Sequence, residues 1–314
     1  MKAQLILNPA AGYRGALRDL QQAIEHLEGR GWGIALRETR GRGDATTYAR
    51  EAVAAGCQAV VVVGGNGTIN EAVNGLAGSD VALGVLPMGT GNVWAAEIGL
   101  VPIPTPLHRP DLLASARALT KGRIRRVDLG RAGDRYFLLW AGVGIDAQVT
   151  QGVEAEPRVM KRRLGPWAYG LAGLAIAWSF VGTRATLLLD GQEVRHRVIL
   201  ILISNAQLYA GMMRVAAKAR LDDGLLDVCC FKGHGFLSTL RHLASVVTRH
   251  HLRDPQVAYY RARRIVVRTS RPLPVQVDGD PIGATPMAFE VVPRALKVIL
   301  PPNAPQELFE SQVA

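Results

Sequence analysis

The feature that most constrains the fold of this 314-residue chain is a run of valines that ends in glycines and leads straight into a helical pattern. Residues 60–76 read VVVVGGNGTINEAVNGL. Four consecutive valines predict a strand that is buried on both faces, as in a parallel sheet. Ile69, Ala72, Val73 and Leu76 are spaced to form one face of a helix. The segment therefore predicts one strand, turn and helix unit of an α/β fold.

The first third of the chain alternates strands and helices with the same rhythm. Leu17, Leu20, Ile24 and Leu27 predict one apolar helix face, and Asp44 is expected to be the N-cap of the following helix. Helices between strands require parallel pairing with both faces of the sheet covered. We therefore predict an α/β doubly wound N-terminal domain, with strands at 3–7, 33–39, 59–63 and 82–86.

The rhythm changes after four prolines between residues 101 and 110. Turn signals at Gly133-Asp134 and Asp190-Gly191 predict two β-hairpins. Further short strands are expected at 225–231, 257–260, 264–269, 274–283, 287–292 and 296–300, with one helix at 237–247. We predict an α/β domain over residues 1–125 and an all-β sandwich C-terminal domain over residues 126–314, whose last strand and tail are free to return to the first domain.

The charge of the chain indicates an anionic partner. Lys and Arg number 37 against 26 Asp and Glu, which gives a net charge of +11. Nucleic acid, a membrane surface and a phosphorylated substrate all fit this charge balance. The basic residues are scattered and no nucleic-acid-binding motif accompanies them, so no nucleic acid is expected. Cys57, Cys229 and Cys230 form neither a disulfide framework nor a metal-binding spacing, which favours a reducing cytoplasm.

An apolar stretch at residues 165–180 is shorter than the ~20 residues that span a bilayer and contains three glycines and a proline. We expect a helix that is either buried or in contact with a membrane. Lys161, Arg162 and Arg163 precede it and suit anionic lipid, although a core helix with a solvated basic flank fits equally well. The expected location is cytoplasmic with peripheral membrane association. An exposed strand in the second half offers a surface for a homodimer.

The glycine turn after residue 63 suits an anion. A helix N-terminus leaves N–H groups unpaired and carries a partial positive charge. Gly64, Gly65 and Gly67 let the backbone approach a phosphate closely, and Thr68 adds a hydroxyl.

A second turn of the same kind lies at residues 83–100, which read LGVLPMGTGNVWAAEIGL. Neighbouring parallel strands place both turns at one carboxyl edge, where ligands of open α/β sheets bind. Neither turn matches a Walker A loop, and Asn70 stands at the third-glycine position of the dinucleotide fingerprint. P-loop NTPases and ordinary Rossmann dehydrogenases are therefore disfavoured.

Six motifs together resemble the diacylglycerol kinase-like lipid kinases, which include bacterial diacylglycerol kinases and sphingosine kinases. The motifs are NPAAG at 8–12, GGNGTINE at 64–71, LPMGTGN at 86–92, GVGIDAQV at 142–149, LDDGLLDV at 221–228 and VDGDP at 277–281. They come in the family's order and cover nearly the whole chain. The glycine turn alone would also suit NAD kinases, but the motifs of the second half are similar to those of the lipid branch.

The resemblance implies transfer of the γ-phosphoryl group of ATP to a lipid hydroxyl, of diacylglycerol or a similar lipid, with Mg²⁺. It implies that the α/β domain binds the nucleotide and the β-domain binds the lipid. The positions that match nucleotide-contacting residues are Asn8, Thr39, Gly65, Asn66, Gly67, Thr68, Asn70, Glu71, Gly89 and Thr90.

The resemblance also implies roles for several acidic residues. Asp280 matches the general base that takes the proton of the attacking hydroxyl, Asp278 flanks it, and Asp146 matches a position near the lipid headgroup. Asp223 matches the side-chain ligand of a structural Mg²⁺, with the carbonyl groups of Arg220 and Leu225. Without the resemblance, Asp-Gly-Asp and Asp-Asp-Gly are ordinary turn sequences.

The chain departs from the family at two positions. The family normally has Asp at 66, where the carboxylate helps to hold the catalytic Mg²⁺, and often Asp at 93, whereas this chain has Asn66 and Val93. The loss of negative charge is expected to weaken Mg²⁺ binding. Three interpretations stay open: a slower kinase, a non-catalytic nucleotide- or lipid-binding protein of the same fold, or an asparagine introduced into an active enzyme.

Overall fold

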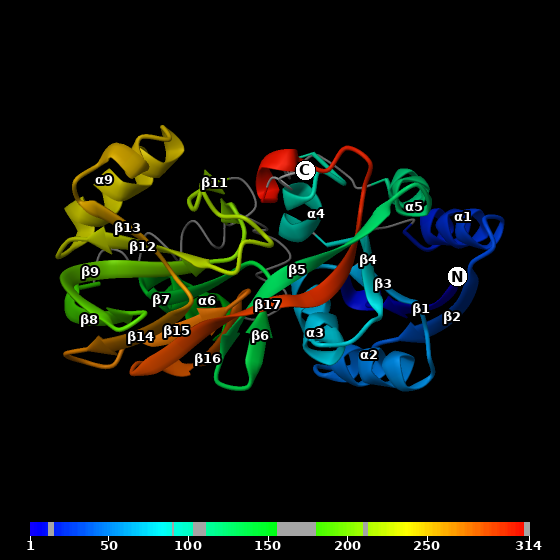
Figure 1. Ribbon diagram of the computed structural model, residues 1–314, viewed down its shortest axis with the longest axis horizontal. Coiled ribbons are helices and arrows are strands. Elements are labelled where there is room, and N and C mark those ends of the chain that lie inside the picture. The colour runs from blue at the N-terminus through cyan, green and yellow to red at the C-terminus, as the bar shows by residue number, and fades with distance from the viewer. Residues whose placement is uncertain (12–15, 90, 103–110, 156–179, 210–212, 311–314) are drawn as a thin grey trace.

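The computed structural model describes residues 1–11, 16–89, 91–102, 111–155, 180–209 and 213–310. Figure 1 shows an α/β half and a β-rich half that lie end to end along the long axis of the molecule. Most strands belong to one continuous sheet with the path β16-β15-β7-β9-β8-β14-β17-β4-β3-β1-β2. The predicted fold class is confirmed: a doubly wound α/β half is followed by a β-rich half.

Four parallel strands form the N-terminal sheet: β1 (Lys2–Leu7), β2 (Gly33–Glu38), β3 (Ala59–Gly64) and β4 (Ala82–Pro87). The valines of β3 alternate between the two faces. Val60 and Val62 pack in one cluster with α2 (Asp44–Ala54) and α3 (Asn66–Leu76). Val61 and Val63 pack in another with α1 (Ala16–Glu28) and α5 (Leu112–Thr120). Helices on both faces explain why the strand is apolar throughout.

Two local expectations for this half are wrong. Leu17 is 71% exposed, and the buried face of α1 consists of Ala16, Leu20, Ala23 and Leu27. Gly43 is the N-cap of α2, and Asp44 is the first helical residue, whose carboxylate accepts hydrogen bonds from the N–H groups of Arg40 and Gly41. β2 is mostly exposed because it lies at the edge of the sheet.

The β-rich half is built mainly from antiparallel pairs. Its strands are β5 (Arg123–Ala132), β6 (Arg135–Phe137), β7 (Trp140–Gly144), β8 (Thr183–Leu189), β9 (Gln192–Ser204), β10 (Leu208–Tyr209), β11 (Met213–Arg214), β12 (Leu226–Lys232), β13 (Val257–Ala262), β14 (Arg264–Thr269), β15 (Pro274–Val277), β16 (Asp280–Ala284) and β17 (Met287–Leu300). Both predicted hairpins are present as the pairs β5–β6 and β8–β9. The predicted helix is α9 (Phe236–Val247), and α6 (Ile145–Ala155) was not expected from the sequence.

The last strand joins the two halves. The sequence predicts separate strands at 287–292 and 296–300, but β17 is a single strand with a shift in its register against β5 between Val292 and Leu296. Its first part pairs with β14, and its last part lies parallel to β4. The predicted boundary between residues 125 and 126 falls inside β5, which pairs with β17 along most of its length.

The apolar stretch 165–180 lies outside the described residues except for Phe180, and so do Lys161, Arg162 and Arg163. Among the helices that the structure describes, none combines the length and the hydropathy needed to cross a membrane.

Candidate functional site

The two glycine turns lie against each other at the carboxyl edge of the parallel sheet. Gly64 of β3 is paired with Pro87 of β4, and the turns follow directly. A Cβ atom on Gly89 would lie only 2.6 Å from the Cα atom of Gly65. Only glycine therefore fits at position 89 without moving the first turn.

A cavity of about 240 Å³ opens beside the first turn. It is lined by Asn8, Ala11, Thr39, Gly41, Gly65, Gly67, Thr68 and Glu71. Six of these are sequence-predicted nucleotide positions, and the fold brings them to one cavity from separate segments of the chain. Asn66, Asn70 and Gly89 do not line the cavity, and Thr90 lies outside the described residues.

The cavity wall is held by hydrogen bonds between its own polar groups. Asn8 donates from Nδ2 to Thr68 Oγ1 at 2.9 Å and accepts the N–H of Ala10 at 3.0 Å. The N–H of Thr39 donates to the carbonyl of Leu7 at 2.8 Å, which extends the pairing of β1 and β2 to the cavity. Glu71 accepts the N–H of Ala45 at 3.3 Å, which ties α3 to the start of α2.

Asn66 connects the two glycine turns. Its Oδ1 accepts the N–H of Val93, the first residue of α4 (Val93–Glu97), at 2.9 Å. The second turn is closed by Asn92, which accepts the N–H of Gly89 at 3.1 Å and donates to its carbonyl at 2.6 Å. A carboxylate at position 66 could accept the same bond from Val93, so this contact does not require an amide.

Asp278 is buried and fully hydrogen bonded. Its Oδ2 accepts the N–H of Leu138 and the Nδ2 of Asn70, both at 2.7 Å. Its Oδ1 accepts the N–H groups of Leu139 and Trp140 at 3.0 and 2.9 Å. Burial raises the pKa of Asp278, and these hydrogen bonds oppose the rise. The carboxylate therefore joins α3 to the β-rich half and holds the turn that carries Asp280.

Asp280, the first residue of β16, stands between two guanidinium groups. Its Oδ2 lies 2.8 Å from Arg135, and its Oδ1 lies 3.1 Å from Arg42. The side chain is 19% exposed, so it is still open to solvent. Arg42 follows Gly41 of the cavity wall, and Arg135 also donates to Asn70 at 3.2 Å. Asp280 therefore lies beside the cavity; the sequence carries no separate signal for the two arginines.

Asp146 lies in the first turn of α6 and is tied to the same region. Its Oδ1 accepts from the hydroxyl of Tyr209, and its Oδ2 accepts from Nε2 of Gln276. Burial raises the pKa of Asp146, and the two hydrogen bonds oppose this. Gln276 also accepts the N–H of Gly279 at 2.7 Å. Asp146 is thus linked through one glutamine to the turn before Asp280, and neither Tyr209 nor Gln276 was identified from the sequence.

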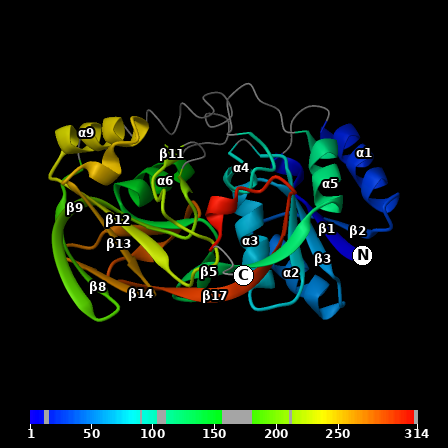
Figure 2. The ribbon, with the colours of Figure 1, turned by 45° about the horizontal axis from the view of Figure 1, so that its top comes forward.

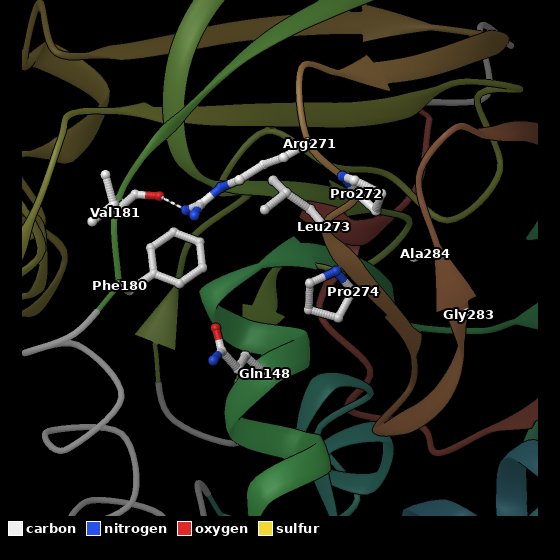
Figure 3. Close-up of a pocket in the computed structure, with 9 residues that line it drawn as sticks. All are labelled: Gln148, Phe180, Val181, Arg271, Pro272, Leu273, Pro274, Gly283 and Ala284. Carbon is white, nitrogen blue, oxygen red and sulfur yellow. Dashed lines mark hydrogen bonds between the residues drawn. The ribbon is translucent and has the colours of Figure 1, made fainter.

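A larger pocket of about 630 Å³ lies in the β-rich half (Figure 3). Its lining is both apolar and polar and consists of Gln148, Phe180, Val181, Arg271, Pro272, Leu273, Pro274, Gly283 and Ala284. Arg271 donates to the carbonyl of Val181 at one side. Ala284 ends the strand that Asp280 begins, and four residues of strand span about 13 Å. One strand therefore leads from Asp280 to the pocket.

The sequence-predicted structural metal site contains an ion pair. Asp223 accepts the N–H of Leu225 at 3.1 Å through Oδ1, and its Oδ2 is paired with Arg261. Within the described ranges, no group of three or more His, Cys, Asp or Glu is arranged to hold a metal. Arg261 supplies the positive charge beside Asp223, and the ligand set of Arg220, Asp223 and Leu225 stays a prediction.

Glu97 is a buried contact between the halves that sequence reasoning missed. It is 3% exposed at the end of α4. Its two oxygens accept the N–H groups of Gln207 and Leu208 at 2.7 and 2.8 Å. Burial raises the pKa of Glu97 to about 7, and the two backbone donors limit the rise. The helix after the second glycine turn is therefore attached to the strand that carries Tyr209.

Replacing Glu97 by glutamine should flatten the pH dependence of stability. The folded-state pKa lies above the ordinary value of 4.5. The contribution of the protonated group is therefore fully present below pH 4.5 and is lost as pH rises through 7. The free energy of unfolding should fall by about 3 kcal/mol more in the wild type than in Glu97→Gln between pH 4.5 and 8. Urea unfolding at several pH values measures this difference, and parallel curves would contradict it.

Comparisons with known proteins agree with this architecture. The model of the diacylglycerol kinase catalytic domain matches residues 2–132, and that of the YegS C-terminal NAD kinase beta sandwich-like domain matches residues 140–300. A diacylglycerol kinase of Bacillus subtilis is 30% identical over 309 residues, covering 98% of this chain and 99% of its own. One of Staphylococcus carnosus is 28% identical over 304 residues, covering 96% and 95%.

A solved structure shares the fold. A diacylglycerol kinase from Bacillus anthracis superposes with a TM-score of 0.77 at 24% identity, covering 96% of this chain and 97% of that one. The two family models together match both halves of the chain, so the chain has the architecture in which a diacylglycerol kinase catalytic domain precedes a β sandwich-like domain. The chain belongs to the diacylglycerol kinase family.

Proposed function

We propose that the protein is an ATP-dependent lipid kinase that transfers the γ-phosphoryl group of ATP to the hydroxyl of diacylglycerol or a similar lipid. The observation that carries this proposal is the position of Asp280. Its carboxylate is paired with Arg42, which follows Gly41 of the cavity wall, and with Arg135. Asp280 also begins β16, the strand that ends at the pocket of the β-rich half.

The first cavity suits a polyphosphate. The N-terminus of α3, with Gly65 and Gly67 on the cavity wall, offers N–H donors and a partial positive charge. Thr68 and Asn8 place polar groups on the same wall. Gly65 and Gly67 line the cavity without side chains, so a phosphate can approach the backbone closely there.

The oxygen donors near this cavity also suit Mg²⁺, a hard cation. Among the described residues, Asn66 Oδ1 accepts one hydrogen bond, from Val93, and the carboxylate of Glu71 lines the cavity. These two residues would therefore hold the ion together with the oxygens of ATP. When bound, Mg²⁺ offsets negative charge on the β- and γ-phosphate oxygens. Asn66 brings no charge to this set, which is the physical reason to expect weakened activity.

The second half provides the acceptor side. The pocket in Figure 3 has the size to take part of a lipid, with apolar side chains such as Phe180 and Leu273 for a chain and with Gln148 and Arg271 for polar groups. Asp280 takes the proton of the acceptor hydroxyl as its oxygen forms the new bond to phosphorus, while the bond to ADP breaks. Asp146, fixed by Tyr209 and Gln276, orients the headgroup.

Transfer from labelled ATP tests the proposal directly. The protein is incubated with γ-labelled ATP, Mg²⁺ and mixed micelles that contain diacylglycerol, and label is expected in the organic phase. Label that enters only NAD or another soluble acceptor would favour an NAD kinase-like reaction. Binding of ATP and lipid without any transfer would favour the non-catalytic member of the fold.

Restoring the acid at position 66 should accelerate this transfer. Asn66→Asp keeps the acceptor for Val93 and adds a charged ligand for Mg²⁺, so kcat should rise at least about tenfold and half-saturation should need less Mg²⁺. The control is Gln192→Glu, which makes the same change from amide to acid at an exposed position of the β8–β9 hairpin. It should leave kcat and the Mg²⁺ dependence unchanged. Equal Mg²⁺ dependence in wild type and Asn66→Asp would contradict a metal role for this turn.

A further inference from the structure

Helix α9 exposes an apolar stripe to solvent. Leu237, Leu240, Leu243 and Val247 are 79%, 49%, 53% and 64% exposed. At 100° per residue these four side chains fall within an arc of about 120° on one face of the helix. They are four of the ten large hydrophobic side chains that are exposed among the described residues, and α9 has twelve residues. The exposure is therefore concentrated on this helix.

The opposite face holds the helix on the protein. His242 and Val246 are buried, and His242 Nε2 lies 2.6 Å from the carbonyl of Lys232. The ring of His242 also meets that of Phe231 edge-on at 5.3 Å. This face anchors α9 on the described part of the chain and leaves the leucine stripe exposed. Figures 1 and 2 place α9 at the end of the β-rich half that is farthest from α1.

The charge around the stripe has one sign. No acidic residue occurs from Lys232 to Arg253, whereas this stretch contains four basic residues, Lys232, Arg241, Arg249 and Arg253, and also four histidines. The next acid, Asp254, is 8% exposed and paired with Arg241 at 2.8 Å. Arg249 and Arg253 are exposed and lie two and six residues beyond Val247, the last residue of α9. A leucine stripe flanked by cations is the pattern of helices that lie in the interface of anionic bilayers.

We propose that α9 is a membrane-docking helix that inserts the side chains of Leu237, Leu240, Leu243 and Val247 into an anionic lipid bilayer. The exposed arginines contact the lipid phosphates, and the helix axis lies along the membrane plane. A second copy of the chain fits this face poorly, since a two-fold contact would bring the same arginines together without any acid. Helix α9 contributes no residue to the cavity of the glycine turns, so binding to vesicles can be measured without nucleotide.

Vesicle binding of matched variants tests the surface. The probe is vesicles of phosphatidylcholine with phosphatidylglycerol, sedimented with the full chain. Leu240→Gln/Leu243→Gln should reduce the partition coefficient about tenfold to a hundredfold. The control is Leu36→Gln/Ile124→Gln. Leu36 is 46% exposed in the α/β half and Ile124 is 51% exposed at its border, so this variant removes similar apolar surface elsewhere and should bind as the wild type does. Arg249→Gln/Arg253→Gln should weaken binding and reduce its dependence on salt.

Every outcome decides the assignment. Reduced binding of the α9 variants alone, with unchanged thermal unfolding, supports it. Equal binding of α9 and control variants, or no binding of wild type to anionic vesicles, overturns it. Self-association that the α9 leucine variant abolishes would instead assign the stripe to an interface between copies. A soluble short-chain acceptor assayed in parallel separates failure of docking from failure of the proposed reaction.

Discussion

Asp280→Asn should lower kcat for phosphoryl transfer by about 10²- to 10⁴-fold, the range expected when a general base is lost. Asparagine has nearly the same shape and can still accept a hydrogen bond from Arg135 or Arg42, but it cannot take the proton of the acceptor hydroxyl. The KM for ATP should change little, because Asp280 does not line the cavity of the glycine turns. Steady-state kinetics with micellar diacylglycerol measures both constants.

Asp80→Asn is the matched control for this change. Asp80 also lies between two basic groups, Arg126 at 2.6 Å and Lys297 at 2.8 Å, but its side chain is 80% exposed and remote from both cavities. This variant should keep wild-type kcat. A kcat for Asp280→Asn within threefold of the wild type would show that another group accepts the proton.

Asp278→Asn should destabilise the protein by about 3 kcal/mol, because two buried donors would lose their acceptor. Asparagine tolerates the positive φ of 47° at this position, so the backbone is not the cause. Its Oδ1 can still accept from Leu139 and Trp140, but its Nδ2 would face the N–H of Leu138 and the amide of Asn70. Urea unfolding measures the loss.

Asp190→Asn is the control for position 278. Asp190 has the same φ of 47°, also precedes a glycine, and accepts the N–H groups of Arg263 and Arg264. It is exposed, so water can replace the lost acceptor, and the cost should stay below about 1 kcal/mol. Similar losses for both variants would mean that burial at Asp278 is not decisive.

Much of the candidate site was predictable because its parts are local in sequence. The glycine turns and the residues Asn8, Thr39, Thr68 and Glu71 come to one cavity because parallel strands share a carboxyl edge. The hairpins around Gly133 and Gly191 follow from turn chemistry, which involves only neighbouring residues. The roles of the metal ligands and of the base stay predictions that the experiments above address.

Other features depended on contacts that no local pattern contains. Leu17 continues a helical period but faces solvent, because alanines provide the buried face of α1. Residues 287–292 and 296–300 read as two strands but form one, because β5 pairs along both. The leucines of α9 have the spacing of a core stripe in sequence, and only the structure shows that they are about half exposed or more.

The sequence by itself determined the alternation of strands and helices in the first half, the two hairpins and the glycine-lined edge, since apolar period and turn chemistry act over a few residues. Tertiary structure alone decided which acids are buried and which remain open. Asn70 and Asp278 are 208 positions apart, and Glu97 lies 110 from Gln207. The energy of a buried carboxylate depends on its desolvation and on its hydrogen-bond partners from distant parts of the chain. Both arise only when the two halves pack against each other.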